Sequence, residues 1–191
     1  MVVAQNYESG GKLVKCPNCE TEMVGLFAVG WRKGALKKLV SEFKYKSVRA
    51  VGEVLAEMLN ETIPDLTSIL PAGVEVVVVP LPTIGKHVRE RGLDHTMILA
   101  WKLAKKRGWK CERVLERAAD TVQVGAKAKE RQEQAKKAYE VVKEVDPSKW
   151  YLLLDDVWTT GASMRAAEQV MREAGAEKIM GAVIEVGENT N

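Results

Sequence analysis

The sequence predicts an α/β fold, in which a doubly wound and mostly parallel sheet carries helices on both faces. Short apolar runs such as VEVVVV (74–79) and YLLL (151–154) are typical of strands buried on both faces of a parallel sheet. Segments with apolar residues at helical spacing alternate with these runs along the chain. The composition, with 46% hydrophobic and 29% charged residues, is that of a globular domain of ordinary size.

The first half of the chain predicts strands at 24–30, 74–79 and 109–117, with helices at 33–43, 48–60 and 93–107. Pro64 and Pro71 bracket the connection that leads into the strand at 74–79. The side chains expected to face inward are Leu36, Leu39, Val40 and Phe43 in the first helix and Val51, Val54, Leu55, Met58 and Leu59 in the second.

The second half begins with a polar, weakly periodic segment at 118–134, which is either a helix containing Gly125 or a long loop ending in a short helix. Strands are expected at 138–142, from Tyr151 onward, and at 176–186. The helix between the last two strands shows a spacing of four in Ala162, Ala166, Val170 and Ala174.

The stretch from Trp150 to Ala174 carries the clearest functional signal. Its apolar strand ends in two adjacent carboxylates, Asp155 and Asp156, and the small, hydroxyl-rich run 159–163 then opens a helix. In such strand–loop–helix units, ligands bind beyond the carboxyl end of the strand. The free N–H groups and the dipole of the helix N-terminus favour an anion there, and Gly161 permits close approach of the backbone. The residues expected to bind a phosphate monoester are Thr159, Thr160, Gly161, Ala162 and Ser163.

The acidic pair would repel that phosphate unless it serves another part of the ligand. Carboxylates can accept hydrogen bonds from vicinal hydroxyls or lie near a divalent cation. A ribose 5-phosphate with free 2- and 3-hydroxyls would satisfy both halves of the stretch. The alternative interpretation is a buried strand that ends in a solvated acidic turn with a threonine N-cap.

A second anion site is predicted after the strand at 74–79, where Pro80-Leu81-Pro82 ends the strand. The basic residues that follow are Lys86, His87, Arg89 and Arg91. Arginine binds diphosphate through paired hydrogen bonds, so this cluster could hold a second anionic group. The alternatives are a surface basic loop, or an ion pair of an arginine with Glu90 or Asp94.

The net charge of +3 is unevenly distributed, because residues 102–137 hold 12 Lys or Arg against 5 Asp or Glu by count along the sequence. This basic region suits a polyanion, either diphosphate or nucleic acid, although a solvated helix face plus a mobile loop gives the same pattern. Lys127, Lys129 and Arg131 would let a loop close over an anionic substrate.

The three cysteines are Cys16, Cys19 and Cys111, an odd number that argues against a disulfide framework. Cys16 and Cys19 form a CxxC knuckle, which is half of a four-ligand zinc site. Three interpretations of this knuckle are open: a degenerate zinc finger that binds no metal, a zinc site completed by another chain or by histidine, and a redox-active pair of cysteines. Residues 1–23 are therefore set apart from the main domain, 24–191. The sequence shows neither an apolar run of membrane-spanning length nor a signal-peptide pattern, and a cytoplasmic location is expected.

The motif LLLDDVWTTGAS resembles the phosphoribosyl-diphosphate (PRPP) signature of type I phosphoribosyltransferases, whereas GxxxxGK[ST] and GxGxxG are absent. Together with the CxxC knuckle, FKYK, VVVVPLP, RERGLDH and the Gln123 to Arg131 segment, it resembles the ComF family over residues 16–186. ComF proteins have a type I phosphoribosyltransferase fold and are associated with natural competence. Some carry a four-cysteine zinc finger. This chain reads RGLDH where the family tends to read RGFNQ, and RQEQ where RxxN is usual.

The resemblance implies an enzyme that uses PRPP and Mg²⁺ to transfer phosphoribosyl to an unknown nitrogen nucleophile. Its implied catalytic residues are Asp155, Asp156, Lys127 and Arg131, and its implied diphosphate-binding residues are Leu81, Pro82, Arg89 and Arg91. The alternative is a competence factor that binds PRPP or a nucleotide without turnover and holds single-stranded DNA on its basic face. Of the tryptophans near that face, Trp101 and Trp109 are expected to be buried in packing. A homodimer is a further option.

Overall fold

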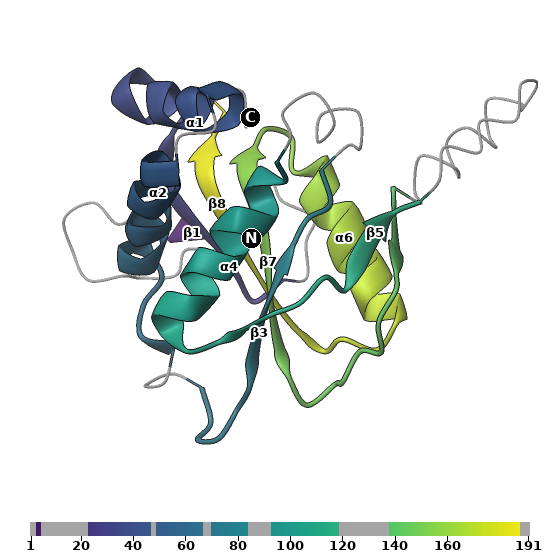
Figure 1. Cartoon of the computed structure of the whole chain (residues 1–191). Coiled ribbons are helices and arrows are strands. Elements are labelled where there is room, and N and C mark those ends of the chain that lie inside the picture. Colours follow the sequence, from purple (N-terminus) through teal and green to yellow (C-terminus); the bar gives the residue numbers. More distant parts are fainter. Residues whose placement is uncertain are drawn as a thin grey trace, which may run out of the picture.

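The computed structural model describes residues 3–4, 23–46, 49–66, 70–83, 93–118 and 138–187. Figure 1 shows the order of the elements along the chain. The helices are α1 (Gly34–Lys46), α2 (Arg49–Thr62), α4 (His95–Arg107) and α6 (Ala162–Glu173). The strands are β1 (Val3–Ala4), β2 (Gly25–Trp31), β3 (Val76–Pro80), β4 (Lys110–Cys111), β5 (Leu115–Arg117), β6 (Tyr139–Val141), β7 (Trp150–Trp158) and β8 (Lys178–Val186).

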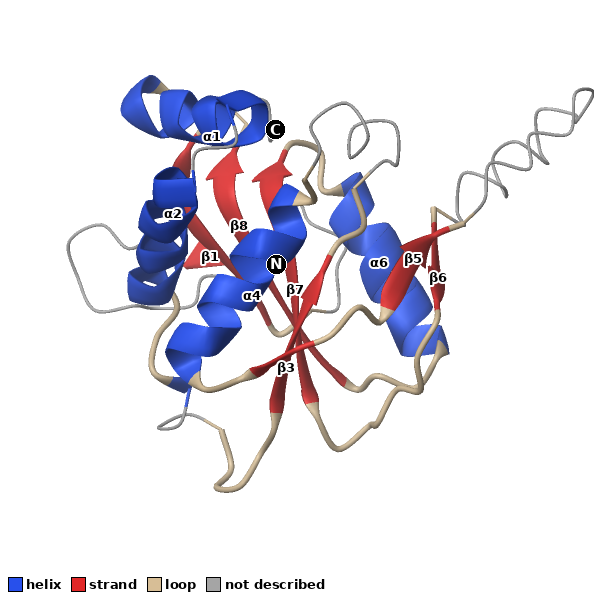
Figure 2. Ribbon diagram, in the orientation of Figure 1, coloured by secondary structure: helices blue, strands red, loops and turns tan. Residues whose placement is uncertain are grey.

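The main sheet has six strands in the order β1-β2-β8-β7-β3-β4, and every neighbouring pair is parallel. Figure 2 shows this sheet between two layers of helix. The central strands are apolar throughout, since all five residues of β3 are buried. A separate antiparallel ribbon is formed by β5 and β6. The predicted α/β fold with a mostly parallel sheet is therefore confirmed.

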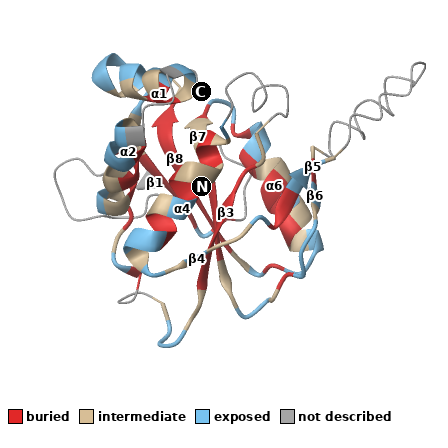
Figure 3. Cartoon of the chain, in the orientation of Figure 1, coloured by how far each residue is buried: buried red, intermediate tan, exposed pale blue. Residues whose placement is uncertain are grey.

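The sheet has a hydrophobic core on each face. On one face, α1, α2 and α4 pack through residues such as Phe43, Leu59 and Leu103. On the other face, α6 and the β5–β6 ribbon pack through residues such as Met171 and Leu115. Figure 3 shows the buried residues gathered along the strands and on the inner sides of these helices. Helices on both faces leave the carboxyl ends of the strands as the place where loops and side chains from both layers meet.

The predicted strand 109–117 is wrong as a single element, because the structure divides it into β4 and β5. β4 is an edge strand of the main sheet, and Glu112 N still donates to Val78 O at 3.0 Å. The chain then turns, with Val114 N donating to Glu112 O at 3.1 Å, and β5 pairs with β6 instead. Neither Gly nor Pro marks this turn in the sequence, so tertiary packing alone reveals it.

One predicted helix face needs correction. Val54, expected to face inward, is 48% exposed on α2, whereas Leu55 and Leu59 are fully buried. The predicted helix after β7 is present as α6. Its buried residues are Met164, Ala167, Glu168 and Met171. Ala166 and Val170, from the row at a spacing of four, are partly buried and pack against the same core.

Glu168 is a charged residue at a buried position of α6. It is 4% exposed and lies in an ion pair with Arg172, one turn later, at 3.3 Å between Oε1 and Nε. The pairing explains how a carboxylate can occupy a buried position of α6.

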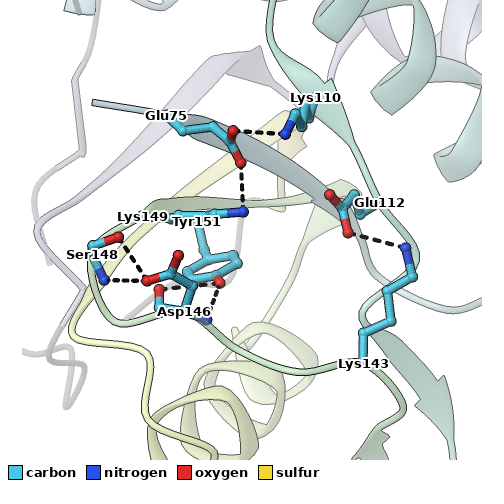
Figure 4. A network of polar contacts seen from close by, with 8 residues as sticks. All are labelled: Glu75, Lys110, Glu112, Lys143, Asp146, Ser148, Lys149 and Tyr151. Atoms are coloured by element: carbon cyan, nitrogen blue, oxygen red, sulfur yellow. Dashed lines mark hydrogen bonds and ion pairs between the residues drawn. The ribbon is translucent and has the colours of Figure 1, made fainter. Parts of the chain in front are cut away.

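A polar network ties together the amino ends of β3, β4 and β7, as Figure 4 shows. Glu75 forms ion pairs with Lys110 and Lys149, both at 2.7 Å, and these two partners lower the pKa of its carboxyl group. Tyr151 Oη accepts a hydrogen bond from Asp146 N at 2.8 Å. These contacts join the amino ends of three strands, opposite the carboxyl end where β7 carries the acidic pair. Among the described helices, none has the length and apolar character needed to cross a bilayer.

Candidate functional site

The acidic pair lies inside the last part of a strand, which runs two residues beyond the carboxylates. β7 extends to Trp158 and so includes Asp155 and Asp156. The usual alternation of faces shifts by one residue here: Leu154 and Val157 both pack against the α1–α2–α4 core, and Trp158 packs against the α6 core. At this shift, the backbone N–H of Asp156 donates a hydrogen bond to Asp155 Oδ1 at 2.8 Å. The shift lets β7 present both carboxylates near its end.

Asp155 faces residues of the β5–β6 ribbon. Burial and then the charge of Asp156 raise the pKa of Asp155 to about 7, while the charges of Lys44 and Arg117 act in the opposite direction. The same carboxylate contributes to the raised pKa of the Tyr139 hydroxyl, for which burial is the main cause. Asp155 can therefore exchange a proton near neutral pH, a property common in functional sites.

Asp156 points to the other layer and forms an ion pair with Lys44, with 2.7 Å between Oδ2 and Nζ. Both side chains are 17% exposed, so the pair is mostly covered but still reachable from solvent. Lys44 lies in the last turn of α1, next to Phe43, whose buried ring meets the His95 ring edge-on with 4.9 Å between centroids. The packing of Phe43 fixes the helix that carries the lysine.

A third carboxylate, Glu185, lies on the neighbouring strand β8, where it pairs in register with Val157. It is 1% exposed, and its Oε1 is 3.2 Å from Nε of Arg32. Its other oxygen, Oε2, is buried and has no hydrogen-bond partner among the described residues. Burial raises the pKa of Glu185, and the charges of Arg32 and Lys44 act against this rise.

The predicted phosphate-binding loop lies at the N-terminus of α6. Gly161 occupies the N-cap position with φ of 75°, and Thr159, Thr160, Ala162 and Ser163 are exposed around it. Ala162 N lies 3.4 Å from Thr160 Oγ1, a long contact that leaves this N–H weakly engaged. The threonine N-cap of the alternative interpretation is wrong, because the cap residue is a glycine without a side chain. The loop therefore lies at a helix N-terminus, and its phosphate-binding role stays a prediction.

The predicted diphosphate loop begins at the end of β3. Leu81 is 2% exposed, and its N donates to Leu154 O at 2.8 Å, which continues the pairing of β3 with β7. Pro82 is half-buried, and its carbonyl oxygen accepts a hydrogen bond from Arg117 Nε at 3.3 Å. The predicted diphosphate and phosphate loops thus follow the carboxyl ends of two adjacent strands, β3 and β7. Asp94 is the N-cap of α4, where it accepts from Met97 N at 3.1 Å, so this helix begins at His95 rather than Leu93.

The sequence interpretation missed Arg117 and Tyr139, which come from the two strands of the antiparallel ribbon. The Arg117 guanidinium carbon lies 5.2 Å from the centroid of the Tyr139 ring, and the Ser163 hydroxyl is near enough to the Tyr139 hydroxyl to act against the rise of its pKa. The ribbon therefore reaches both predicted anion loops, at Pro82 and at Ser163. The sequence indicated only that Arg117 ends a predicted strand, and nothing in it showed that this side chain reaches the site. Lys44, also missed, lies within the quoted motif FKYK.

Several predicted site residues lie outside the described residues: Cys16, Cys19, Arg89, Arg91, Lys127 and Arg131. Their assignments stay predictions. Within the described ranges, no cluster of three or more His, Cys, Asp or Glu side chains could hold a metal ion. Cys111 is a free, half-buried thiol whose pKa is raised by burial.

Comparison with solved structures defines the class of fold. The chain superposes with a TM-score of 0.51 and 18% identity on glutamine PRPP amidotransferase from B. subtilis complexed with ADP and GMP, over 75% of this chain and 30% of that one. The "allosteric regulatory enzyme of purine biosynthesis" matches with a TM-score of 0.48 and 17% identity, again over 75% and 30%. The chain thus corresponds to under a third of each protein's length. Its fold is that of the type I phosphoribosyltransferases.

One curated relative narrows this class. The chain is 25% identical over 174 residues to Competence protein F of Haemophilus influenzae (strain ATCC 51907 / DSM 11121 / KW20 / Rd), which covers 86% of this chain and 75% of that protein. No family model matches the chain. The resemblance to the ComF family, which the sequence motifs indicated, is confirmed.

Proposed function

We propose that this protein binds PRPP and transfers its phosphoribosyl group to a nitrogen nucleophile, in the cytoplasm. One observation carries the proposal: Asp155 and Asp156 lie at the carboxyl end of β7, directly before the glycine-capped N-terminus of α6. Paired acceptors beside an anion site match a sugar phosphate with vicinal hydroxyls. The fold class supports the same ligand, although fold by itself does not establish chemistry.

The 5-phosphate would bind at the N-terminus of α6. The backbone N–H groups of Ala162 and Ser163 and the hydroxyls of Thr159 and Thr160 are the donors there, and all four residues are exposed. The close approach of the phosphate to the backbone depends on Gly161. A Cβ at this position would overlap Cζ2 of Trp158, so any other residue would displace the loop from its position above that ring.

The acidic pair would accept hydrogen bonds from the two ribose hydroxyls, each of which donates one proton. In the reaction, the bond between C1 and the diphosphate oxygen breaks, the nitrogen lone pair forms the new bond to C1, and the nitrogen loses a proton to solvent or base. Positive charge develops on the ribose ring as the C1–O bond breaks. Asp156, and Asp155 in its ionised form, would stabilise that charge electrostatically.

The departing diphosphate would lie near Arg117, whose guanidinium group reaches the Pro82 carbonyl from β5. Arg89, Arg91, Lys127 and Arg131 are proposed to complete this subsite. Mg²⁺ fits as an ion carried by the substrate, because it is often bound through one or two carboxylates together with substrate phosphates, and the acidic pair can supply the former. The ion would neutralise charge on the leaving diphosphate.

A second candidate is a PRPP- or nucleotide-binding factor without turnover that also holds single-stranded DNA. The observation in its favour is Trp101, which is 54% exposed on α4 rather than buried as expected, with Lys105 Nζ 5.3 Å from its ring centroid. Exposed aromatic rings beside cations can stack on bases. Against it, Lys102 and Lys106 on the same helix are paired with glutamates of α2, which reduces the positive charge of this face.

A diphosphate-release assay separates the two candidates. The protein is incubated with PRPP, Mg²⁺ and a panel of bases and amines, and diphosphate is measured continuously. The enzyme proposal predicts release with at least one acceptor, and loss of that release in Asp155→Asn. PRPP binding by titration calorimetry without acceptor-dependent release across the panel would favour the second candidate.

We also propose that zinc binding and dimer formation are linked. If another chain completes the Cys16–Cys19 knuckle, protein purified without chelator should carry roughly one zinc per two chains, because two thiolate pairs make a tetrahedral site. Light scattering of the same sample should then show a dimer. A metal-free sample would identify the knuckle as degenerate.

A further inference from the structure

The ion pair between Lys44 and Asp156 has no role in the function proposed above, and it lies at the centre of the site. In the proposed function the acidic pair needs only acceptor oxygens. Yet Asp156 Oδ2 already binds an ammonium group at 2.7 Å from a helix that is distant in the sequence. A lysine at this position adds hydrogen-bond donors to a group of acceptors, so the site offers both kinds of partner to one ligand atom.

Lys44 is held in place by its surroundings. Phe43, the preceding residue, is 2% exposed, and a Cβ added to Gly52 would come within 2.9 Å of the Phe43 ring. The absence of a side chain at Gly52 therefore lets α1 and α2 approach closely. This packing fixes the last turn of α1, and the 17% exposure of the Lys44 side chain shows that its stem is mostly covered.

The ammonium group also lies in the field of two other carboxylates. The charge of Lys44 lowers the pKa of both Asp155 and Glu185, against the effect of burial. Glu185, buried on β8, has its Oε1 on Arg32 and its Oε2 unpartnered among the described residues. The Lys44 ammonium group therefore contacts Asp156 directly and acts electrostatically on two further carboxyl groups, and its N–H groups are hydrogen-bond donors.

We propose that Lys44 and Asp156 act as a donor and an acceptor for one and the same ribose hydroxyl, and that Lys44 thereby selects ribose phosphates over deoxyribose phosphates. This inference rests on the proposed function. A hydroxyl group donates one proton and accepts others. Asp156 would take the proton, and Lys44, which has three N–H donors, would give a hydrogen bond to the hydroxyl oxygen.

The selectivity for ribose arises because a ligand without the hydroxyl leaves charged groups of the protein without a hydrogen-bond partner. A ligand that covers the site displaces the water around the Lys44–Asp156 pair. With ribose, the hydroxyl replaces that water for both charged groups, whereas a deoxyribose leaves them poorly solvated. Sites built to hydrogen-bond a hydroxyl reject analogues that lack it far more strongly than apolar pockets do. Without the ammonium group, part of this penalty disappears.

The test measures affinities of ribose 5-phosphate, 2-deoxyribose 5-phosphate and 3-deoxyribose 5-phosphate by titration calorimetry. The proteins compared are the wild type, Lys44→Met, Lys44→Arg and the control Lys37→Met. Lys37 is a matched control because it lies on α1, is exposed, and also acts on the pKa of Glu185. Thermal melting of each variant checks the fold.

The expected result is that Lys44→Met lowers the preference for ribose over one of the two analogues by roughly tenfold, the scale of a hydrogen bond to a charged group. Lys44→Arg, which keeps a charged donor, and Lys37→Met should preserve the wild-type preference. A purely structural role for Lys44 would weaken all three ligands equally and leave the ratios unchanged. Ratios unchanged in Lys44→Met overturn the inference, and so does loss of the preference in Lys37→Met.

If Lys44→Met does not fold, Lys44→Gln takes its place, and a smaller loss of the preference for ribose is expected, since its amide still donates a hydrogen bond but carries no charge. Failure of the proposed function looks different from failure of this inference. If wild-type protein binds none of the three sugar phosphates, the proposed function fails. If it binds them and prefers ribose, with that preference intact in Lys44→Met, only the inference about Lys44 fails.

Discussion

The backbone of Gly161 lies against the indole ring of Trp158, three residues earlier in the chain. A Cβ at position 161 would overlap Cζ2, Cη2 and Cε2 of that ring, and the glycine has φ of 75°. Trp158 is 3% exposed and belongs to the core under α6. The ring thus forms a rigid floor under the predicted phosphate loop, and only glycine fits above it.

We expect Gly161→Ala to lose binding of sugar phosphates and to destabilise the fold by about 2 kcal/mol or more, because strain at positive φ adds to the clash with a buried ring. Urea unfolding and calorimetry with ribose 5-phosphate measure the two effects. Gly175→Ala is the matched control: φ there is 103° but nothing lies within 4 Å of an added Cβ. It should show the strain alone and bind normally. Equal stability losses in the two variants would contradict the role given to Trp158.

The raised pKa of Asp155 makes a prediction about stability and pH. Its carboxyl has a pKa of about 7 in the folded protein, above the value of about 4 in an unfolded chain. The folded state therefore favours the protonated form, so this contribution to stability is complete below about pH 4 and is lost as pH rises toward 7. The variant Asp155→Asn cannot ionise and therefore does not lose this stability as pH rises. It should raise the melting temperature by several degrees at about pH 8 and have little effect at about pH 4.

Melting curves of the wild type and Asp155→Asn between those two pH values test this dependence. Glu173→Gln serves as a control, since Glu173 is exposed on α6. Its difference from the wild type should stay flat across the range. A melting temperature for Asp155→Asn that falls below the wild type at high pH would show that Asp155 is stabilised as an ion.

The contacts of Arg107, which lies far from the site, lead to a prediction about the free energy of unfolding. Its guanidinium group donates to Asn60 Oδ1 at 2.7 Å and to Pro64 O at 3.1 Å, and also to the carbonyls of Asn60 and Ile63. These contacts satisfy carbonyl groups at the C-terminus of α2. Arg107→Ala should destabilise the protein by about 2–3 kcal/mol in urea unfolding. Lys106→Ala, which removes an exposed ion pair with Glu57, should change it little.

The sequence predicted the central strands well because their chemistry is local. A run such as VVVV at 76–79 can only be buried on both faces, and Gly161 next to two hydroxyl residues indicates a turn whatever surrounds it. The same local reasoning ended the strand at the acidic pair, since charged residues normally end a buried run. In the structure β7 continues to Trp158, and Lys44 and Arg117 act against the effect of burial on the acidic pair.

Those two cations could not be assigned from the sequence, since each reaches the site from a separate element. Lys44 comes from α1 and Arg117 from the ribbon, and both are brought to β7 only by packing of the two layers. The division of 109–117 into two strands escaped prediction for the same reason. It is also this division that forms the ribbon and turns Arg117 toward Pro82.

The basic region allows enzyme and DNA-binding factor to be separated by mutation. We expect replacement of Lys127, Lys129 and Arg131 by Ala to weaken phosphoribosyl transfer and to leave single-stranded DNA affinity nearly unchanged. Replacement of Trp101 and Lys105 by Ala is the matched variant on α4 and should leave transfer intact. Fluorescence anisotropy with a labelled oligonucleotide over a salt series measures DNA binding, and each lost phosphate contact should flatten the log–log slope by roughly 0.7. Normal PRPP binding with a much flatter slope in the triple variant would contradict the account.

The most direct test of the proposed function is calorimetric titration of PRPP with Mg²⁺ into the wild type and into the double variant Asp155→Asn, Asp156→Asn. The asparagines keep the size of both side chains but remove the charged acceptors for the ribose hydroxyls. The account predicts PRPP binding by the wild type and its loss in the double variant, with cooperative thermal unfolding retained, while Glu173→Gln binds as the wild type does. PRPP affinity that is the same in the wild type and the double variant would contradict it.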